Sequence, residues 1–468
     1  MNKITFVYKG RYFVRDTETI SYLSAIAKSC GYTTSLAYDQ DLFGISDNIL
    51  YQPLLNRVFN SRNYVIKRIV MDKPKYVVFL KNFNNSDWIK NLCQILRRIE
   101  SNIKIVVISP INDGVCFTEC DYYFVGEPEQ VFRGFLTGKE LKGVANMDTL
   151  PLPDKDLFAE YIDFSLSYMV YTSKGCVGSC SYCEETIYKN EYGVEYYRRR
   201  KVENVIAELK LAKEKYSCRE VIFKDSVFTV DKNWLKKFLE IYRREINIPY
   251  KCFGKADVFD EEIAQLLKSS GCYCVEFGIQ TLNERIRYKI LCRKETLAQI
   301  KKALEICEKY QLRYDIDHMF GLPEETVEDH KKALEFYSSL KYLNRIKCHN
   351  LVVYPQAKIR EFIASTDVKD FFAGVAGEGK MKQVNKNFEK IFKVLPLLPG
   401  GIVSFLLKRN NWRLFSFVPT ALIILAQLII GIKNRDLRFK VYIYEYPRKI
   451  LYHLKIKFFP NSIIPQNI

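Results

Sequence analysis

A regular alternation of short apolar runs and amphipathic helical stretches, from residue 167 to residue 358, restricts the fold of this chain more than any other feature. Short apolar runs suit buried parallel strands, and the stretches between them have the length of crossover helices. Six such units predict a partial (β/α)6 barrel, whose functional loops follow the carboxyl ends of its strands. The expected strands are 167–173, 220–224, 250–254, 274–279, 313–318 and 347–353, and the expected helices 201–215, 232–245, 260–269, 295–310 and 326–340.

Three cysteines, Cys176, Cys180 and Cys183, stand at C-x3-C-x2-C spacing on a Gly- and Ser-rich loop directly after the first of these strands. Three thiolates on one short loop can bind three irons of a 4Fe–4S cube. The next cysteine along the chain is Cys218, so no fourth thiolate follows nearby. The fourth iron is therefore expected to stay open to another ligand.

Residues 1–140 show a similar alternation, which predicts a doubly wound parallel sheet with its ligand crevice at the carboxyl ends of the strands. Residues 141–166, which contain Pro151 and Pro153, are expected to link this domain to the barrel of residues 167–358. The expected strands of the first domain are 3–8, 32–38, 76–80, 103–109 and 122–126, and its expected helices are 17–29, 47–70, 87–99 and one after Pro128.

The C-terminal region, residues 359–468, lacks this alternation and is expected to be mostly helical. It carries most of the basic excess, because +11 of the formal charge of +18 lies in the last 79 residues. Residues 414–432 contain no charge and approach the roughly 20 residues of a membrane span, but Pro419 interrupts them and basic residues flank both ends. Basic flanks on both sides favour peripheral contact with an anionic membrane surface over a span. A buried helix of a C-terminal subdomain is the alternative. Nucleic-acid binding is not expected, because the basic excess lies in the tail and no stacking platform is visible.

The N-terminus has no apolar signal-peptide core, so a cytoplasmic protein with reduced thiols is expected. Peripheral contact of its C-terminal region would place it at the inner face of the membrane. Isolated cysteines are then interpreted as small buried hydrophobic residues. Cys116 and Cys120, and Cys272 and Cys274, could bind a second cluster, but core positions are favoured because further ligands are lacking. His318 ends an expected strand and could contact substrate, although a structural role is favoured for a single histidine.

Several motifs together resemble the radical S-adenosylmethionine (SAM) superfamily over about residues 165–360. The cysteine spacing, with an aromatic residue before the last cysteine, is the first of them. The others are Val221–Asp231, similar to the second strand and its Asp-rich turn; Val275–Thr281, similar to the fourth-strand Gly-Ile-Glu-Ser motif; Phe320–Asp329, similar to the Gly-Leu-Pro-Gly-Glu-Thr segment; and Tyr354-Pro355, similar to the end of the sixth strand.

The resemblance implies that the three thiolates bind a 4Fe–4S cluster, that SAM chelates the open iron, and that a low-potential donor such as flavodoxin or ferredoxin supplies the electron for its reductive cleavage. It also implies SAM-binding positions for Tyr182, Asp225, Ser226, Lys255, Gln280 and Arg293. Gln280 departs from the family's usual Glu, and its neutral amide can still hydrogen-bond a hydroxyl. Ordinary solvation at the barrel mouth is the alternative for the five polar side chains, that is, for all of these except Tyr182.

Residues 1–140 resemble the cobalamin-binding domain that often precedes such a barrel, through the order of elements and the turn Tyr123–Glu129. The cobalt-ligating version of that domain carries Asp-x-His-x-x-Gly, whereas the matching stretch here has Asp41 in place of His. The first histidine of the chain is His318. The resemblance therefore implies cobalamin bound without a protein histidine, or a domain that has lost the cofactor. The residues implied in corrinoid binding are Asp39, Asp41, Gly44, Gly126 and Glu127; simple turn chemistry is the alternative for the aspartates.

The sequence thus predicts a radical SAM enzyme that uses cobalamin for methyl transfer to a small-molecule or lipid-like substrate, or for a radical rearrangement or cyclisation. A radical SAM enzyme without corrinoid, whose first domain docks a substrate or partner, is the second hypothesis. A non-catalytic iron–sulfur sensor or scaffold is the third. The identity of a catalytic side chain and of the substrate does not follow from the sequence.

Overall fold

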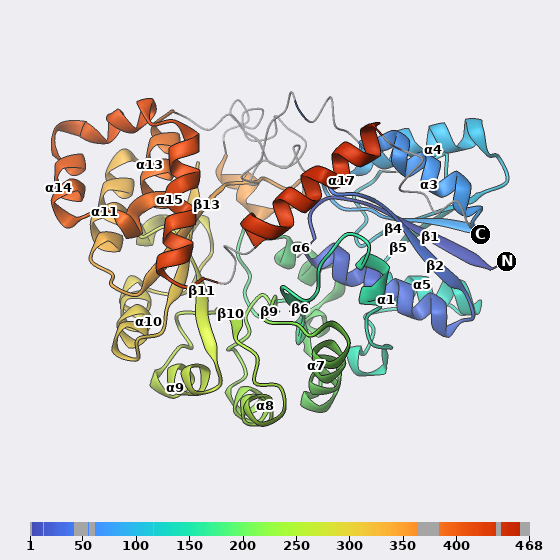
Figure 1. Cartoon of the computed structure of the whole chain (residues 1–468), viewed down its shortest axis with the longest axis horizontal. Coiled ribbons are helices and arrows are strands. Elements are labelled where there is room, and N and C mark those ends of the chain that lie inside the picture. The colour runs from blue at the N-terminus through green and yellow to red at the C-terminus, as the bar shows by residue number, and fades with distance from the viewer. Residues whose placement is uncertain are drawn as a thin grey trace. The chain divides into compact units, whose positions relative to one another are not determined.

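The computed structural model describes residues 2–12, 14–41, 55, 61–115, 117–363, 383–436 and 441–458. These residues form two compact units, each built on its own parallel sheet (Figure 1). The first unit contains the described parts of Met1–Asp163, Tyr188–Arg198 and Tyr444–Ile468, so a helix from the end of the chain belongs to it. The second contains those of Phe164–Ile187 and Arg199–Ile443.

The sheet of the first unit has five parallel strands in the order β2-β1-β3-β4-β5, which confirms the predicted doubly wound sheet. Helices cover both of its faces. Phe132 of α5 packs on Phe6 of β1, and Leu92 and Leu96 of α4 belong to the core on the opposite face. The elements are β1 (Lys3–Lys9), α1 (Arg15–Ser29), β2 (Thr33–Asp39), α3 (Arg62–Asp72), β3 (Tyr76–Leu80), α4 (Ser86–Ile99), β4 (Lys104–Ser109), β5 (Tyr122–Val125), α5 (Pro128–Thr137) and α17 (Tyr446–Phe458).

The predicted strands of the first domain all form. The apolar residues of β1, β3 and β4 are mostly buried on both faces of the sheet, as parallel packing requires, whereas the edge strand β5 leaves Tyr122 and Val125 exposed. Of the predicted helix 47–70, the part from Arg62 is observed as α3, and residues 47–54 and 56–60 lie outside the described residues. Tyr452 of α17 hydrogen-bonds Tyr64 of α3 at 2.8 Å, which holds the C-terminal helix on this unit.

The sheet of the second unit has six parallel strands in the order β6-β9-β10-β11-β12-β13, which confirms the predicted partial barrel. A helix follows each of the strands β9 to β12 (Figure 1). The elements from residue 168 to residue 350, of which Tyr188–Arg198 belong to the first unit, are β6 (Tyr168–Val170), β7 (Ser173–Lys174), α6 (Glu184–Tyr192), β8 (Arg198–Arg199), α7 (Val202–Tyr216), β9 (Val221–Phe223), α8 (Lys232–Glu245), β10 (Tyr250–Gly254), α9 (Glu261–Ser269), β11 (Cys272–Gln280), α10 (Leu297–Lys309), β12 (Tyr314–Phe320), α11 (Val327–Ser338) and β13 (Leu343–Asn350).

The last part of the second unit is helical, as predicted, with α13 (Gln383–Val394), α14 (Gly400–Leu407) and α15 (Thr420–Lys433). The apolar segment 414–432 is divided at Pro419, because proline has no amide hydrogen to continue a helix. Among the described residues no single helix is long and apolar enough to cross a membrane. The segments Gly400–Phe417 and Thr420–Lys433 are long and apolar enough only when they are taken together, and the chain bends by 107° between them.

Candidate functional site

The cysteine loop follows β7, a short strand paired with β8, and begins a few residues after the carboxyl end of β6 in the six-stranded sheet. Cys176, Cys180 and Cys183 are half-buried free thiols. A Cβ atom on Gly178 would lie 3.5 Å from Cys176 Sγ and 3.9 Å from Cys180 Sγ, so two sulfurs face the space beside this glycine. The Gly178 amide donates to Cys176 Sγ at 3.3 Å. The donor set fits a cluster held on one short loop by three thiolates.

Ser181 anchors the middle of this loop to distant parts of the same unit. Its hydroxyl donates to the Ile290 carbonyl at 2.5 Å, and its amide donates to the Leu291 carbonyl at 3.0 Å. Its own carbonyl accepts from the amide of Ile359 at 3.0 Å. These backbone contacts hold the loop between Cys180 and Cys183 in one position.

Asp225 follows β9 and supports the start of the same loop. Its fully buried carboxylate accepts hydrogen bonds from the Thr172 hydroxyl at 2.8 Å, the Ser173 hydroxyl at 2.5 Å and the Thr172 amide at 3.3 Å. Thr172 and Ser173 lie only a few residues before Cys176. Ser226, in contrast, is exposed. Asp225 therefore positions the cysteine loop, whatever else it binds.

The end of β11 has an unusual backbone at Gln280, whose φ of 68° lies in the left-handed region. The pairing register with β12 also shifts between Gly278 and Gln280. Buried Arg287 holds this turn, because its guanidinium donates to the carbonyls on both sides of Gln280, those of Ile279 and Thr281. A left-handed non-glycine residue costs free energy, and such strained residues are enriched at functional sites.

The side chain of Gln280 supplies an open hydrogen-bond acceptor. Its Oε1 atom is buried and has no hydrogen-bond partner among the described residues. A Cβ atom on Gly278 would lie 3.0 Å from Gln280 Nε2 and 3.8 Å from Arg293 Nη1, so the glycine leaves room between these two side chains. A ligand hydroxyl or ammonium group could satisfy the bare oxygen, which fits the SAM position that the resemblance implies.

Arg293 links the cysteine loop to the end of β11. Its Nη1 atom lies 3.1 Å from the Tyr182 hydroxyl and 3.9 Å from Cys180 Sγ. Its Nη2 atom donates to Glu295 Oε1 at 2.6 Å, and Lys255 Nζ lies 3.9 Å from the same oxygen. Lys255 also pairs with Asp257. The structure thus brings together Cys180, Tyr182, Lys255, Gln280 and Arg293, all five of them predicted site residues.

Sequence reasoning missed Glu295 and Arg287, which organise this cluster. Burial alone would raise the pKa of Glu295, but the charges of Arg293, Lys255 and Arg287 outweigh it and lower that pKa below its ordinary value. No spacing in the sequence marks either residue. Their roles depend on the turn after β11, which only the folded chain forms.

A buried charge network lies on the face of the sheet shared by Glu276 and Asp315, and sequence reasoning missed its members Lys251, Glu276 and Lys347. Lys251 Nζ lies 2.6 Å from Glu276 Oε2 and pairs with Asp315 as well, while Lys347 Nζ lies 2.6 Å from Glu276 Oε1. Asp317 lies on the same face, and burial, together with the charge of Glu276, raises its pKa. The sequence does contain a signal for this network, because its charged residues stand within strands whose other residues are mostly apolar.

His318 does not point into this charged face. Strand alternation places it on the side opposite to Asp317, and its ring packs against Phe392 of α13 and Tyr337 of α11. The structural role favoured from the sequence agrees with this position. Cys272 and Cys274 are buried, as expected of core thiols. Cys116 lies outside the described residues.

In the first unit, Asp39 and Asp41 form a turn at the carboxyl end of β2. Asp39 Oδ1 accepts from the Asp41 amide at 3.0 Å, and Asp41 pairs with Lys9 at 3.5 Å. Burial, partly offset by Lys9, raises the pKa of Asp41 to about 6. Between them, the buried Gln40 has an Oε1 atom without a hydrogen-bond partner among the described residues. This oxygen, at the carboxyl end of β2, could accept a hydrogen bond from a ligand that has an N–H or O–H group. Gly44 lies outside the described residues.

Gly126 and Glu127 start helix α5. A Cβ atom on Gly126 would lie 2.6 Å from Val131 Cγ1, and its φ of 146° also favours glycine. Glu127 is the N-cap of α5, where it accepts from the Gln130 amide at 3.3 Å and the Ala145 amide at 3.2 Å, and it pairs with Arg198. Both residues thus have a structural role in this unit.

The C-terminal helix adds a histidine to the first unit, which the sequence-based reasoning did not foresee. That reasoning excluded an imidazole from the first domain because the chain has no histidine before His318. His453 of α17 is buried in the first unit, and its Nδ1 atom lies 3.0 Å from the Lys449 carbonyl. Burial lowers the pKa of His453, and the charge of Asp39 acts in the opposite direction. The exclusion therefore holds for residues 1–317 only.

Comparisons with known proteins agree with this geometry. Residues 170–337 match the Radical SAM superfamily. The chain is 26% identical over 286 residues to an uncharacterized methyltransferase of Pyrococcus horikoshii, with 53% of this chain and 61% of that protein covered. The chain therefore spans less than two thirds of that relative.

Two solved structures are similar in fold. The radical S-adenosylmethionine methyltransferase TsrM from Kitasatospora setae matches with a TM-score of 0.57 and 14% identity, over 77% of this chain and 75% of that chain. The cobalamin-dependent S-adenosylmethionine radical enzyme OxsB matches with a TM-score of 0.62 and 12% identity, over 97% of this chain and 81% of that chain. Residues 170–337 are therefore a radical SAM domain, and the fold of the chain is similar to those of TsrM and of the cobalamin-dependent enzyme OxsB.

Proposed function

We propose that the chain is an enzyme that cleaves SAM reductively at the carboxyl ends of strands β6 to β13, with a 4Fe–4S cluster on Cys176, Cys180 and Cys183. The main support for this proposal is the position of Arg293. Its guanidinium contacts Tyr182 and the Cys180 sulfur of the cysteine loop, and it lies beside the turn where the Gln280 Oε1 atom has no hydrogen-bond partner among the described residues. When bound, the cluster supplies one low-potential electron and an open iron for SAM.

The side chains then have distinct tasks. The three thiolates hold the cluster, and the Arg293 N–H group near Cys180 Sγ favours the more negative charge state of that sulfur. Gln280 accepts a hydrogen bond from SAM, and Lys255 and Arg293 are placed for its carboxylate. Asp225 and Ser181 keep the loop in position.

The test is anaerobic reconstitution with iron and sulfide, followed by reduction in the presence of SAM and measurement of 5′-deoxyadenosine by mass spectrometry. Cys180→Ala is expected to lose the 4Fe–4S absorbance and all 5′-deoxyadenosine formation. Cys30→Ala, a half-buried thiol of the first unit, is the matched control and should retain both. An unmodified protein that binds a full cluster but never cleaves SAM would favour the sensor or scaffold hypothesis.

For the reaction, methyl transfer that uses cobalamin in the first unit is proposed, on a small-molecule or lipid-like substrate. The flavodoxin-like strand order and the bare Gln40 oxygen at the carboxyl end of β2 support a ligand there. The similarity to the methyltransferase of Pyrococcus horikoshii and to TsrM supports methyl transfer. When bound, a corrinoid supplies the chemistry of a methyl carrier.

Stoichiometric corrinoid binding, read from the visible spectrum, separates this proposal from an enzyme without corrinoid. Absence of binding would favour a docking role for the first unit. Cobalamin is proposed to bind without a protein histidine, so His453→Ala should leave the bound corrinoid's spectrum unchanged. A changed spectrum would instead make His453 a cobalt ligand.

Peripheral contact with an anionic membrane is proposed for the C-terminal helices of the second unit. On α15, Ile423 and Ile430 are buried against the protein. Leu422, Leu425 and Ile429 are exposed, so the solvent-facing side of the helix is apolar as well. Exposed basic residues flank it, which complements anionic headgroups; they include Arg413, Lys433 and Arg435.

Vesicle co-sedimentation tests this contact without deleting α17, which belongs to the first unit. The triple variant Leu422→Gln, Leu425→Gln and Ile429→Gln should lose binding to phosphatidylglycerol vesicles. Leu211→Gln, which changes an exposed leucine of α7, is the control. The proposal would be contradicted if all forms sedimented equally with the vesicles, or if the unmodified protein did not sediment with them at all.

A further inference from the structure

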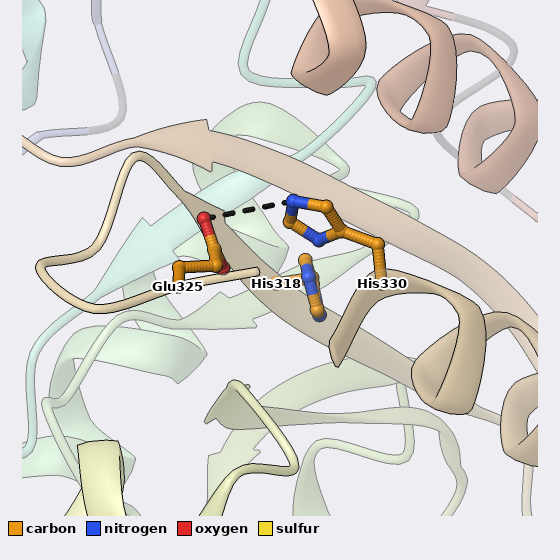
Figure 2. A group of neighbouring side chains, drawn as sticks. All are labelled: His318, Glu325 and His330. Atoms are coloured by element: carbon orange, nitrogen blue, oxygen red, sulfur yellow. Dashed lines mark ion pairs between the residues drawn. The ribbon is translucent and has the colours of Figure 1, made fainter. Parts of the chain in front are cut away.

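His318, Glu325 and His330 form a buried cluster on the side of β12 that faces α11 and α13. His318 belongs to β12, Glu325 to the turn that follows it, and His330 to the first turn of α11 (Figure 2). Each side chain offers one ligand atom, and these atoms all lie within 4.8 Å of one another. The side chains of Glu325 and His330 are 4% and 2% exposed, and His318 is 1% exposed.

Each member of the cluster has one polar atom held by a neighbour. His318 Nδ1 lies 3.2 Å from the Tyr337 hydroxyl, and His330 Nε2 lies 3.3 Å from Asn385 Oδ1. Glu325 Oε2 accepts from the amides of Gly321 at 2.9 Å and Leu322 at 3.4 Å. These contacts fix the orientation of both rings and of the carboxylate.

The opposite atom of each member is bare. His318 Nε2, His330 Nδ1 and Glu325 Oε1 are buried and have no hydrogen-bond partner among the described residues. Buried polar atoms in native proteins are almost always satisfied. Three bare atoms from three adjacent side chains therefore indicate a shared ligand, and all three atoms are of kinds that donate a lone pair.

Two imidazole nitrogens and one carboxylate oxygen are a common donor set for zinc. In such sites the other nitrogen of each ligating histidine is held by a nearby oxygen, as Tyr337 and Asn385 hold these two. We propose that His318 Nε2, His330 Nδ1 and Glu325 Oε1 bind a zinc ion, with water as the fourth ligand. Tetrahedral zinc places its ligand atoms about 3.3 Å apart, and the three side chains already offer ligand atoms within 4.8 Å of one another.

This ion would tie together elements that surround the Gly321–Glu325 turn. It joins β12, the turn and α11 directly, and it reaches α13 through Asn385. The site uses none of the cysteine-loop residues and does not depend on the proposed function. The bound ion would thereby fasten α13 of the second unit to the barrel.

The competing arrangement is a metal-free ion pair. His330 Nε2 lies 3.7 Å from Glu325 Oε2, and a proton on the ring would pair these two groups. That arrangement leaves His318 Nε2 bare and gives zinc no effect on the protein. A zinc titration therefore separates the two.

The experiment uses the full chain with Cys176→Ala, Cys180→Ala and Cys183→Ala, so that the cysteine loop binds neither iron nor zinc. After dialysis against a chelator, zinc is titrated in competition with a chromophoric chelator. One equivalent is expected to bind and to raise the melting midpoint by about 3–8 °C. Cobalt(II) in place of zinc should give visible bands without sulfur charge transfer.

His318→Gln and His330→Gln should each weaken zinc binding by at least about 100-fold, and Asn385→Ala by about tenfold. His349→Gln, which changes a partly exposed histidine of β13 outside the cluster, is the matched control and should bind as before. Absence of zinc binding by the protein with an intact cluster would overturn the proposal, even if the histidine variants fail to fold. Binding that survives both His→Gln changes would overturn it as well.

Discussion

Arg293 Nη1 lies 3.1 Å from the Tyr182 hydroxyl, which places a guanidinium from the segment after β11 directly beside the cysteine loop. The same nitrogen lies 3.9 Å from Cys180 Sγ. One side chain thus connects the site of the cluster with the turn at Gln280. This relationship suggests that Arg293 controls the properties of the cluster more than the stability of the fold.

Arg293→Met is expected to keep the bound 4Fe–4S cluster but to shift its reduction potential to a more negative value, because an N–H group beside a ligating sulfur is lost. Electron paramagnetic resonance at controlled potentials measures the shift. Arg285→Met removes an exposed arginine that pairs with Glu324, and it should leave the potential unchanged. The same potential in both variants would exclude an electronic role for Arg293.

Gln280→Gly should relieve a strained backbone while removing the bare amide oxygen. The melting midpoint is expected to stay the same or rise, since glycine adopts a positive φ without cost, whereas SAM affinity should fall about tenfold with the lost hydrogen bond. Gln311 also has a positive φ, of 52°, and is exposed, so Gln311→Gly is a matched control for the backbone effect alone. Undiminished SAM affinity in Gln280→Gly, by isothermal titration, would separate Gln280 from the SAM site.

Asp225→Asn should disorder the start of the cysteine loop, because an amide cannot accept three hydrogen bonds from Thr172 and Ser173 as a carboxylate does. Iron content after reconstitution is expected to fall at least twofold, and the destabilisation to be about 1–3 kcal/mol. Asp231→Asn makes the same change at the N-cap of α8, where asparagine caps equally well, and should have little effect. Full iron content in Asp225→Asn would show that the loop does not need this support.

Gly126→Ala should destabilise the first unit by about 1–3 kcal/mol, because the added Cβ would lie 2.6 Å from Val131 Cγ1. Gly400→Ala is the control, since a Cβ there meets nothing within 4 Å. Thermal unfolding by circular dichroism measures both. Corrinoid binding is then measured with the folded Gly126→Ala protein. Weaker binding than in the unmodified protein would show that this turn also contacts the ligand.

The raised pKa of Asp41 predicts a pH dependence in the first unit. Between pH 4 and about 6 the folded chain keeps a proton that the unfolded chain releases, so the free energy of unfolding falls as the pH rises through this range, by at most about 3 kcal/mol. Above about pH 6 this effect levels off. Asp41→Asn should remove this part of the pH dependence in thermal unfolding at pH 4.5 and pH 7. An unchanged difference between the two pH values would mean that Asp41 titrates normally.

Much of the fold and the central part of the site are predictable from the sequence. Strands such as Tyr76–Leu80 and Val221–Phe223 are apolar runs bounded by polar residues, and local pattern decides them. The spacing of Cys176, Cys180 and Cys183 marks the cluster site because all three ligands lie on one loop. These strands and the cluster site depend on residues that are close together in the sequence, so they can be predicted without knowing which distant residues are in contact.

Only the tertiary structure decided the features that depend on residues far apart in the chain. Arg287 and Glu295 have no motif, and their roles arise from the turn that follows β11. His453 reaches the first unit because α17 packs against Tyr64, 388 residues earlier in the chain. His318 and His330 become neighbours because β12 and α11 pack together, and alternation along β12 turns His318 away from the barrel interior. A sequence records which groups are present, whereas packing determines which of them meet and which polar atoms remain bare.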